Sequence, residues 1–154
     1  MDPLAPDAID SPSPLLSAGV LELSVCEVMT TGVVTIAGDS TLDQAVDAMA
    51  EHRIHAVLVV GTRSGTPLGW ITTRGLLGLL GIDGRSPATE AITEEAKAIE
   101  PTASLRSAIY ALSFPGVTRL LVRRREETDS EGVVTDFDLT VRATRLAGFS
   151  RRPE

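Results

Sequence analysis

The chain repeats itself without a gap, and this repeat restricts the available folds more than any other feature of the sequence. The stretch GWITTRGL, residues 69–76, aligns with GVVTDFDL, residues 132–139, at an offset of 132 − 69 = 63 residues. A single register held over the whole unit indicates a duplication. The same offset pairs identical residues along the chain: Glu27 with Glu90, Leu42 with Leu105, Ala45 with Ala108, Leu58 with Leu121, and Thr72 with Thr135.

Each unit predicts the element order β-α-β-β-α. Apolar and β-branched runs indicate the strands, and apolar residues at helical spacing indicate the helices. Thr41 with Gln44 predicts a capping box at one helix start, and Ser104 predicts a cap at the equivalent helix. One unit is too small to bury its own sheet, so we expect a mixed α+β fold in which the two sheets pack together. Strands are expected at residues 33–36, 56–60, 68–72, 96–99, 118–123 and 132–135.

The expected domain boundaries follow the repeat, with residues 17–82 as the first unit and residues 83–147 as the second. Residues 1–16 are acidic and rich in proline and lack a hydrophobic period, which predicts a disordered tail. Residues 148–154 are expected to form a C-terminal tail that frays.

Composition argues against several functional classes. A net charge of −7 with 3% aromatic residues argues against a nucleic-acid-binding protein and against attraction to anionic membrane surfaces. No apolar stretch is long enough to span a bilayer. One cysteine excludes an intrachain disulfide, and with only two histidines no local zinc site can form. A cytoplasmic protein without membrane or nucleic-acid partners is the expectation.

The sequence also carries no motif of a known catalytic site. It lacks the Gly-x-Ser-x-Gly, phosphate-loop and His-Glu-x-x-His patterns. The one enzymatic interpretation is an acid–base pair of Asp136 and Asp138. That pair would need a carboxyl group kept protonated, and the positive end of the following helix opposes this. A non-enzyme is therefore expected.

The residues from VMT (28–30) through STLDQA (40–45) and HRIHAVLVV (52–60) to the Gly-apolar-apolar-Thr strand end resemble a CBS domain. Residues 99–139 resemble it more loosely, so the chain is similar to a stand-alone tandem pair, also called a Bateman module. The resemblance implies two units related by pseudo-two-fold symmetry, with two clefts between them. It further implies a homodimer without a resident cofactor. It also implies that the module binds AMP, ADP, ATP or S-adenosylmethionine and regulates a partner protein, here unknown.

The family pattern places a ribose-binding carboxylate at Asp138 and a helix-start hydroxyl at Thr135, beside Asp136. The alternative is structural: Thr135 caps the helix, and both acids interact favourably with its dipole. In the first unit Thr72 is kept, but Gly75 stands where the carboxylate should be. We therefore expect at most one nucleoside per chain.

The remaining binding residues also follow from the resemblance. Phosphate contacts are assigned to His55 in the first unit and to Thr118 and Arg119 in the second, because arginine can bind two phosphate oxygens at once. The base is expected near the first strands, at residues 33–36 of the first unit, including Thr35 and Ile36, and at residues 97–99 of the second. The alternatives are a packed histidine, a solvated arginine and ordinary core residues. The competing function is a structural or protein-interaction module with vestigial clefts.

Overall fold

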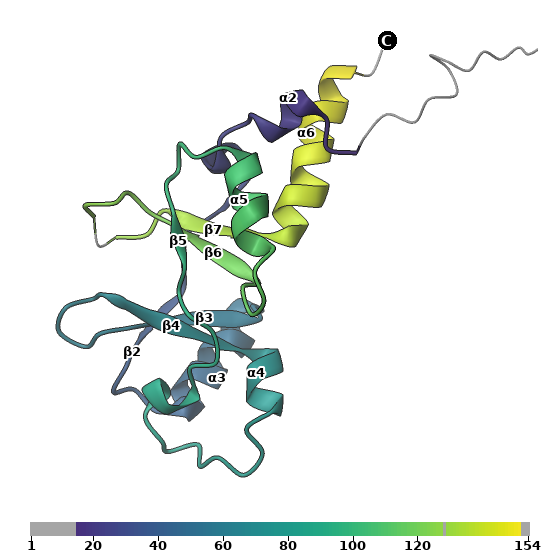
Figure 1. Ribbon diagram of the computed structural model, residues 1–154. Coiled ribbons are helices and arrows are strands. Elements are labelled where there is room, and N and C mark those ends of the chain that lie inside the picture. The colour runs from purple at the N-terminus through teal and green to yellow at the C-terminus, as the bar shows by residue number, and fades with distance from the viewer. Residues whose placement is uncertain (1–14, 128, 152–154) are drawn as a thin grey trace, which may run out of the picture.

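The computed structural model describes residues 15–127 and 129–151, and it contains two mixed β-sheets that face each other (Figure 1). The predicted N-terminal tail falls outside the described residues up to residue 14, as do residues 152–154 of the predicted C-terminal tail. The first sheet contains β2 (Thr35–Ala37), β3 (Ala56–Val60) and β4 (Pro67–Thr72); the second contains β1 (Thr30–Thr31), β5 (Ala98–Ile99), β6 (Arg119–Val122) and β7 (Gly132–Thr135).

The strand registers confirm the duplication. In the first sheet β2 runs parallel to β3, and β3 is antiparallel to β4, with Leu58 opposite Trp70. In the second sheet β5 runs parallel to β6, and β6 is antiparallel to β7, with Leu121 opposite Val133. These pairs differ by the same 121 − 58 = 63 residues. The predicted β-α-β-β order is therefore present twice.

The first strand of the first unit is displaced from its predicted position at residues 33–36. It begins only at Thr35, because the chain changes sheets just before it. The preceding strand β1 pairs with β7 of the second sheet, whereas β2 pairs with β3 of the first. Residues 32–34 make this crossing, and Gly32 has a positive φ of 89°, which glycine adopts without strain.

The main helices begin where their caps were predicted. At the start of α3 (Leu42–His52), Gln44 N donates to Thr41 Oγ1 at 3.2 Å, and Thr41 N donates to Gln44 Oε1 at 2.9 Å. At the start of α5 (Leu105–Leu112), Ser107 N donates to the Ser104 hydroxyl. The helices α3 and α4 (Thr73–Leu77) cover the outer face of the first sheet, and α5 covers that of the second (Figure 1).

Each sheet forms one packed body with the helices that cover it, and the two bodies exchange their opening segments. Val20 in α2 (Ala18–Leu21) and Val25 in the 3₁₀ helix η1 (Val25–Glu27) are buried in the core of the second body, with Leu105 and Leu120. The 3₁₀ helix η2 (Ala88–Ala91) is buried in the core of the first body. Each body therefore contains the opening segment of the other sequence unit.

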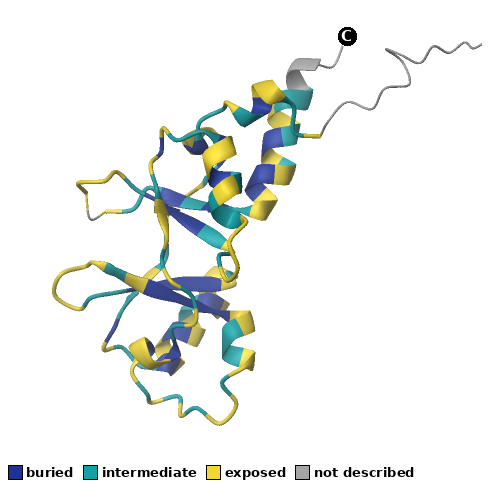
Figure 2. Ribbon diagram, in the orientation of Figure 1, coloured by how far each residue is buried: buried dark blue, intermediate teal, exposed yellow. Residues whose placement is uncertain are grey.

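A third apolar cluster holds the two sheets together. It consists of Ala56, Leu58, Trp70 and Leu121, all buried between the sheets. Figure 2 shows buried strand residues in both sheets. Beyond β7, a π-helical turn η3 (Asp138–Arg142) leads into α6 (Ala143–Arg151). This helix extends past residue 147, the predicted end of the second unit. Within the described part of the chain, no helix is long and apolar enough to cross a membrane.

Candidate functional site

Two clefts open between the sheets, one beside each of the strand ends at Thr72 and Thr135, the threonines that the two units share. Cleft A has a volume of about 540 Å³, within the range of small-molecule sites. Cleft B has a volume of about 280 Å³. Cleft A is lined by residues 30–34 and 52–56 with Trp70, Arg119, Val133 and Thr135; cleft B is lined by His55, residues 72–75, Thr93, Glu94, Gly116, Thr118 and Arg119.

Cleft A is basic although the chain is acidic. Four of its lining residues are His52, Arg53, His55 and Arg119, and none of its described lining residues is an aspartate or glutamate. The two histidines are the only ones in the sequence. Arg53 ends α3 in the left-handed conformation, with φ 53° and ψ 48°, which few residues other than glycine adopt readily. This concentration of basic side chains on a chain of net charge −7 favours an anion in cleft A.

Thr135 and Asp138 form a reciprocal cap at the start of the last helix. Thr135 N donates to Asp138 Oδ2 at 3.0 Å, and Asp138 N lies 3.4 Å from Thr135 Oγ1. The Thr135 hydroxyl also donates to Asp138 Oδ2 at 3.2 Å. On the other oxygen, Thr30 Oγ1 donates to Oδ1 at 3.3 Å and Arg142 Nε lies 3.5 Å from it.

The cap therefore accounts for Oδ2 of Asp138, and contacts with Thr30 and Arg142 account for Oδ1 of this residue, which is only 2% exposed. Thr135 lines cleft A, while Asp138 lies behind it and anchors it. Asp136 is exposed, and its carboxylate accepts a hydrogen bond from Phe137 N at 2.7 Å. The two acids thus have different environments, and Asp138 is the one attached to the wall of the cleft.

In cleft B the equivalent strand end is closed by a threonine. Thr72 Oγ1 accepts a hydrogen bond from Gly75 N at 2.9 Å and lies 3.4 Å from Thr93 Oγ1. A Cβ atom added to Gly75 would lie 2.7 Å from Thr93 Cβ, which is closer than such atoms approach. Thr93 thus occupies the space that an aspartate at position 75 would need.

Arg119 is shared by the two clefts. Its guanidinium lies over the Trp70 ring, 5.7 Å from the ring centroid, and its Nε donates to Thr118 Oγ1 at 3.2 Å. Trp70 is buried, and its indole Nε1 has no hydrogen-bond partner within the described residues. His55 also lines both clefts. The basic groups assigned to phosphate in the two units therefore meet at the centre of the molecule.

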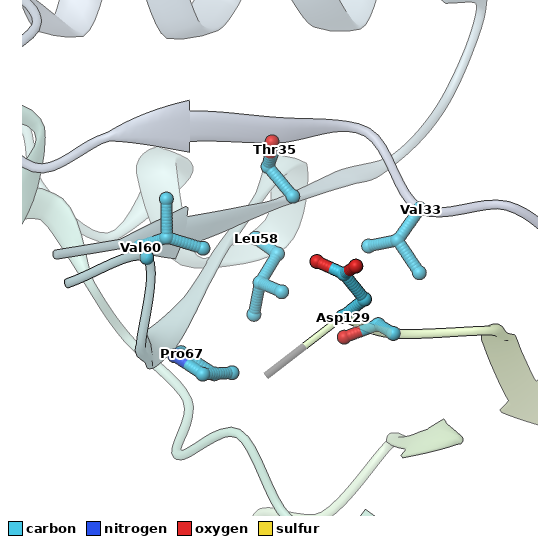
Figure 3. A pocket seen from close by; sticks show the side chains of 8 residues that line it. Val33, Thr35, Leu58, Val60, Pro67 and Asp129 are labelled. Carbon is cyan, nitrogen blue, oxygen red and sulfur yellow. The ribbon is translucent and has the colours of Figure 1, made fainter. Parts of the chain in front are cut away.

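Two of the residues assigned to the base, Thr35 and Ile36, lie elsewhere. Thr35 lines a third cavity of about 350 Å³, which Figure 3 shows with Val33 near it and Asp129 entering from the β6–β7 connection. Ile36 packs against the core of the first body. The structure thus brings Thr135, His55 and Arg119 together in cleft A, and Thr72, Thr118, His55 and Arg119 together in cleft B.

Several residues that line cleft A were not assigned to a site from the sequence, among them Thr30, His52, Arg53 and Trp70. His52 and Arg53 immediately precede the apolar strand and lie in the same HRIHA stretch as His55, so their position was a usable signal. Thr30 was aligned with Thr93 by the repeat, but nothing local indicated that β1 would join the other sheet. Among the described residues, no group of His, Cys, Asp and Glu side chains is arranged to hold a metal ion.

Comparisons with known proteins agree with this architecture. Residues 25–81 match the family model of the CBS domain. A curated relative, the CBS domain-containing protein YhcV of Bacillus subtilis (strain 168), is 29% identical over 121 residues, which cover 77% of this chain and 84% of that protein.

Two solved structures show the same fold at low sequence identity. The AcuB structure from Vibrio cholerae is 23% identical and superposes with a TM-score of 0.69 over 87% of this chain and 99% of its own. The CBS domain of the bacterial CNNM/CorC family Mg²⁺ transporter, in complex with ATP, is 21% identical. It superposes with a TM-score of 0.66 over 78% of this chain and 86% of its own.

Proposed function

We propose that this chain, whose residues 25–81 match the CBS domain, is a tandem CBS pair and a regulatory module that senses a phosphorylated adenosine ligand in cleft A. The observation that carries the proposal is the basic lining of this cleft, formed by His52, Arg53, His55 and Arg119 in an acidic chain. A related CBS domain, that of the CNNM/CorC transporter, has been solved with ATP.

The charge of cleft A discriminates among the adenosine ligands. AMP, ADP and ATP carry negative phosphates that the two arginines attract and to which the two histidines can donate hydrogen bonds, and arginine can bind two phosphate oxygens at once. S-adenosylmethionine instead carries a positive sulfonium and an ammonium group beside its carboxylate. The proposal is therefore a nucleotide, with the adenine placed against the apolar lining residues Val33, Val34 and Ile54.

The ribose is assigned to the strand end at Thr135. Its hydroxyl lines the cleft and is held by Asp138. For a ribose to reach the Asp138 carboxylate, the Thr30 hydroxyl must release Oδ1, which it contacts at 3.3 Å. Thr30 is exposed, and a rotation about its χ1 angle achieves this release.

Ligand binding would act on a partner through a change in cleft A, which lies between the two sheets.

The second candidate function is an interaction module, favoured by large apolar side chains exposed on two helices: Leu77 on α4 and Tyr110 on α5, with Leu80 and Phe114 following them. Homodimerisation through these helices is part of the proposal. Sedimentation of the wild-type protein and of Tyr110→Ser would test it.

The sensing proposal is tested by isothermal titration calorimetry with ATP, AMP, adenosine and S-adenosylmethionine. ATP should bind most tightly. Arg53→Gln should weaken ATP binding about 10- to 100-fold, because a charge-assisted hydrogen bond contributes about 1.5–3 kcal/mol. Arg63→Gln, an equal change of charge in an exposed loop, is the matched control and should leave binding unchanged. Equal affinity for ATP and S-adenosylmethionine, or no ATP binding, would refute the proposal.

A further inference from the structure

Cleft B contains an anion of the protein's own. The Glu94 carboxylate accepts two hydrogen bonds from one residue: Thr118 N donates to Oε2 at 3.0 Å, and Thr118 Oγ1 donates to Oε1 at 2.7 Å. Both residues line the cleft. The carboxylate is therefore bound by a backbone amide and a hydroxyl, as an external oxyanion would be.

The surroundings of this carboxylate suit a phosphate equally well. Arg119 donates from Nε to the same Thr118 hydroxyl at 3.2 Å, and Arg74 and His55 also line the cleft. Backbone amides, hydroxyls and arginine side chains are the usual donors to phosphate oxygens. An external phosphate in cleft B would thus compete with Glu94 for the donors at Thr118.

The position of Glu94 is built into the fold. Its backbone pairs with β4, since Trp70 N donates to Glu94 O at 2.8 Å. This pairing places the side chain beside Thr118. The repeat aligns Glu94 with Thr31 and Thr118 with His55, both of which line cleft A. Cleft A therefore has a neutral hydroxyl where cleft B has a carboxylate, and an imidazole where cleft B has a threonine.

We propose that the Glu94 carboxylate occupies cleft B in place of a phosphate group. It thereby excludes phosphorylated ligands from this cleft. A phosphate entering the wild-type cleft must displace the carboxylate from both donors and then lie beside a like charge. With Glu94 in place, the module has a single anion site, cleft A. The restriction to cleft A rests on the proposed function, whereas the exclusion from cleft B does not.

The test removes the carboxylate while cleft A is disabled. Inorganic pyrophosphate is titrated into Arg53→Gln and into the double variant Arg53→Gln/Glu94→Thr, which places in cleft B the residue that cleft A has at position 31. Binding is followed by calorimetry and by amide chemical shifts. The double variant should bind at least tenfold more tightly than Arg53→Gln, with the largest shift at the Thr118 amide. In the otherwise wild-type chain, Glu94→Thr should raise the stoichiometry from one pyrophosphate to two.

Glu94→Gln, which keeps the shape of the side chain, repeats the measurement if the threonine variant folds poorly. Glu95→Gln, an equal change of charge at the exposed neighbouring residue, is the control and should not create a site. The proposal is overturned if the double variant binds no better than Arg53→Gln, or if Glu95→Gln has the same effect as Glu94→Gln. If the wild type binds neither ATP nor pyrophosphate but Glu94→Thr binds pyrophosphate at Thr118, the proposed function fails and this inference stands.

Discussion

Replacing Asp138 by alanine should destabilise the fold whether or not a ligand is present. The carboxylate is 2% exposed and is contacted by the Thr135 amide at 3.0 Å, the Thr135 hydroxyl at 3.2 Å, the Thr30 hydroxyl at 3.3 Å and Arg142 Nε at 3.5 Å. Loss of a helix cap costs about 1 kcal/mol, and a partly buried amide left without its acceptor costs about 1–3 kcal/mol more. We expect Asp138→Ala to lower the free energy of unfolding by about 2–4 kcal/mol.

Urea denaturation with unchanged m-value measures this loss, and the urea midpoint should fall accordingly. Asp136→Ala is the matched control: that acid is exposed and contacts only the adjacent amide, so its removal should change stability by less than about 0.5 kcal/mol. Asp138→Asn keeps an acceptor and should lie between the two. If Asp138→Ala is as stable as Asp136→Ala but no longer binds ATP, the carboxylate serves the ligand and the capping argument is refuted.

Two further substitutions test the asymmetry and the geometry of the clefts. Gly75→Ala should lower the free energy of unfolding by about 1–3 kcal/mol, because the new Cβ would clash with Thr93. Adding Thr93→Gly to the same chain should restore most of the lost stability. Gly19→Ala, whose Cβ would meet open space, is the control and should not destabilise the chain in the same urea assay. Arg53→Gly should raise the free energy of unfolding by up to about 1 kcal/mol by relieving its left-handed backbone, and calorimetry should show weaker ATP binding; a loss of stability would contradict this account of Arg53.

The repeat allowed the approximate strand positions and the equivalence of the two units to be predicted because hydrophobic patterns and turn signals are local properties that both copies share. The exchange of opening segments could not be predicted this way. Thr30 and Thr93 are equivalent in sequence, and which sheet each one joins depends on residues far along the chain. Asp138 shows a similar limit: its spacing from Thr135 fits both a ribose contact and a cap, and only burial and the contact from Thr30 distinguish the two roles.

The exchanged opening segments also set the order in which the chain can be completed during synthesis. Val20, Val25 and Val28 emerge from the ribosome well before the residues that bury them, which lie between Leu105 and Ala143. The first body likewise waits for Ala88 and Ala91. Contacts so distant along the chain close slowly and leave apolar side chains exposed in the meantime. The nascent protein therefore cannot fold one repeat at a time, and its two halves mature together once the last helix has been synthesised.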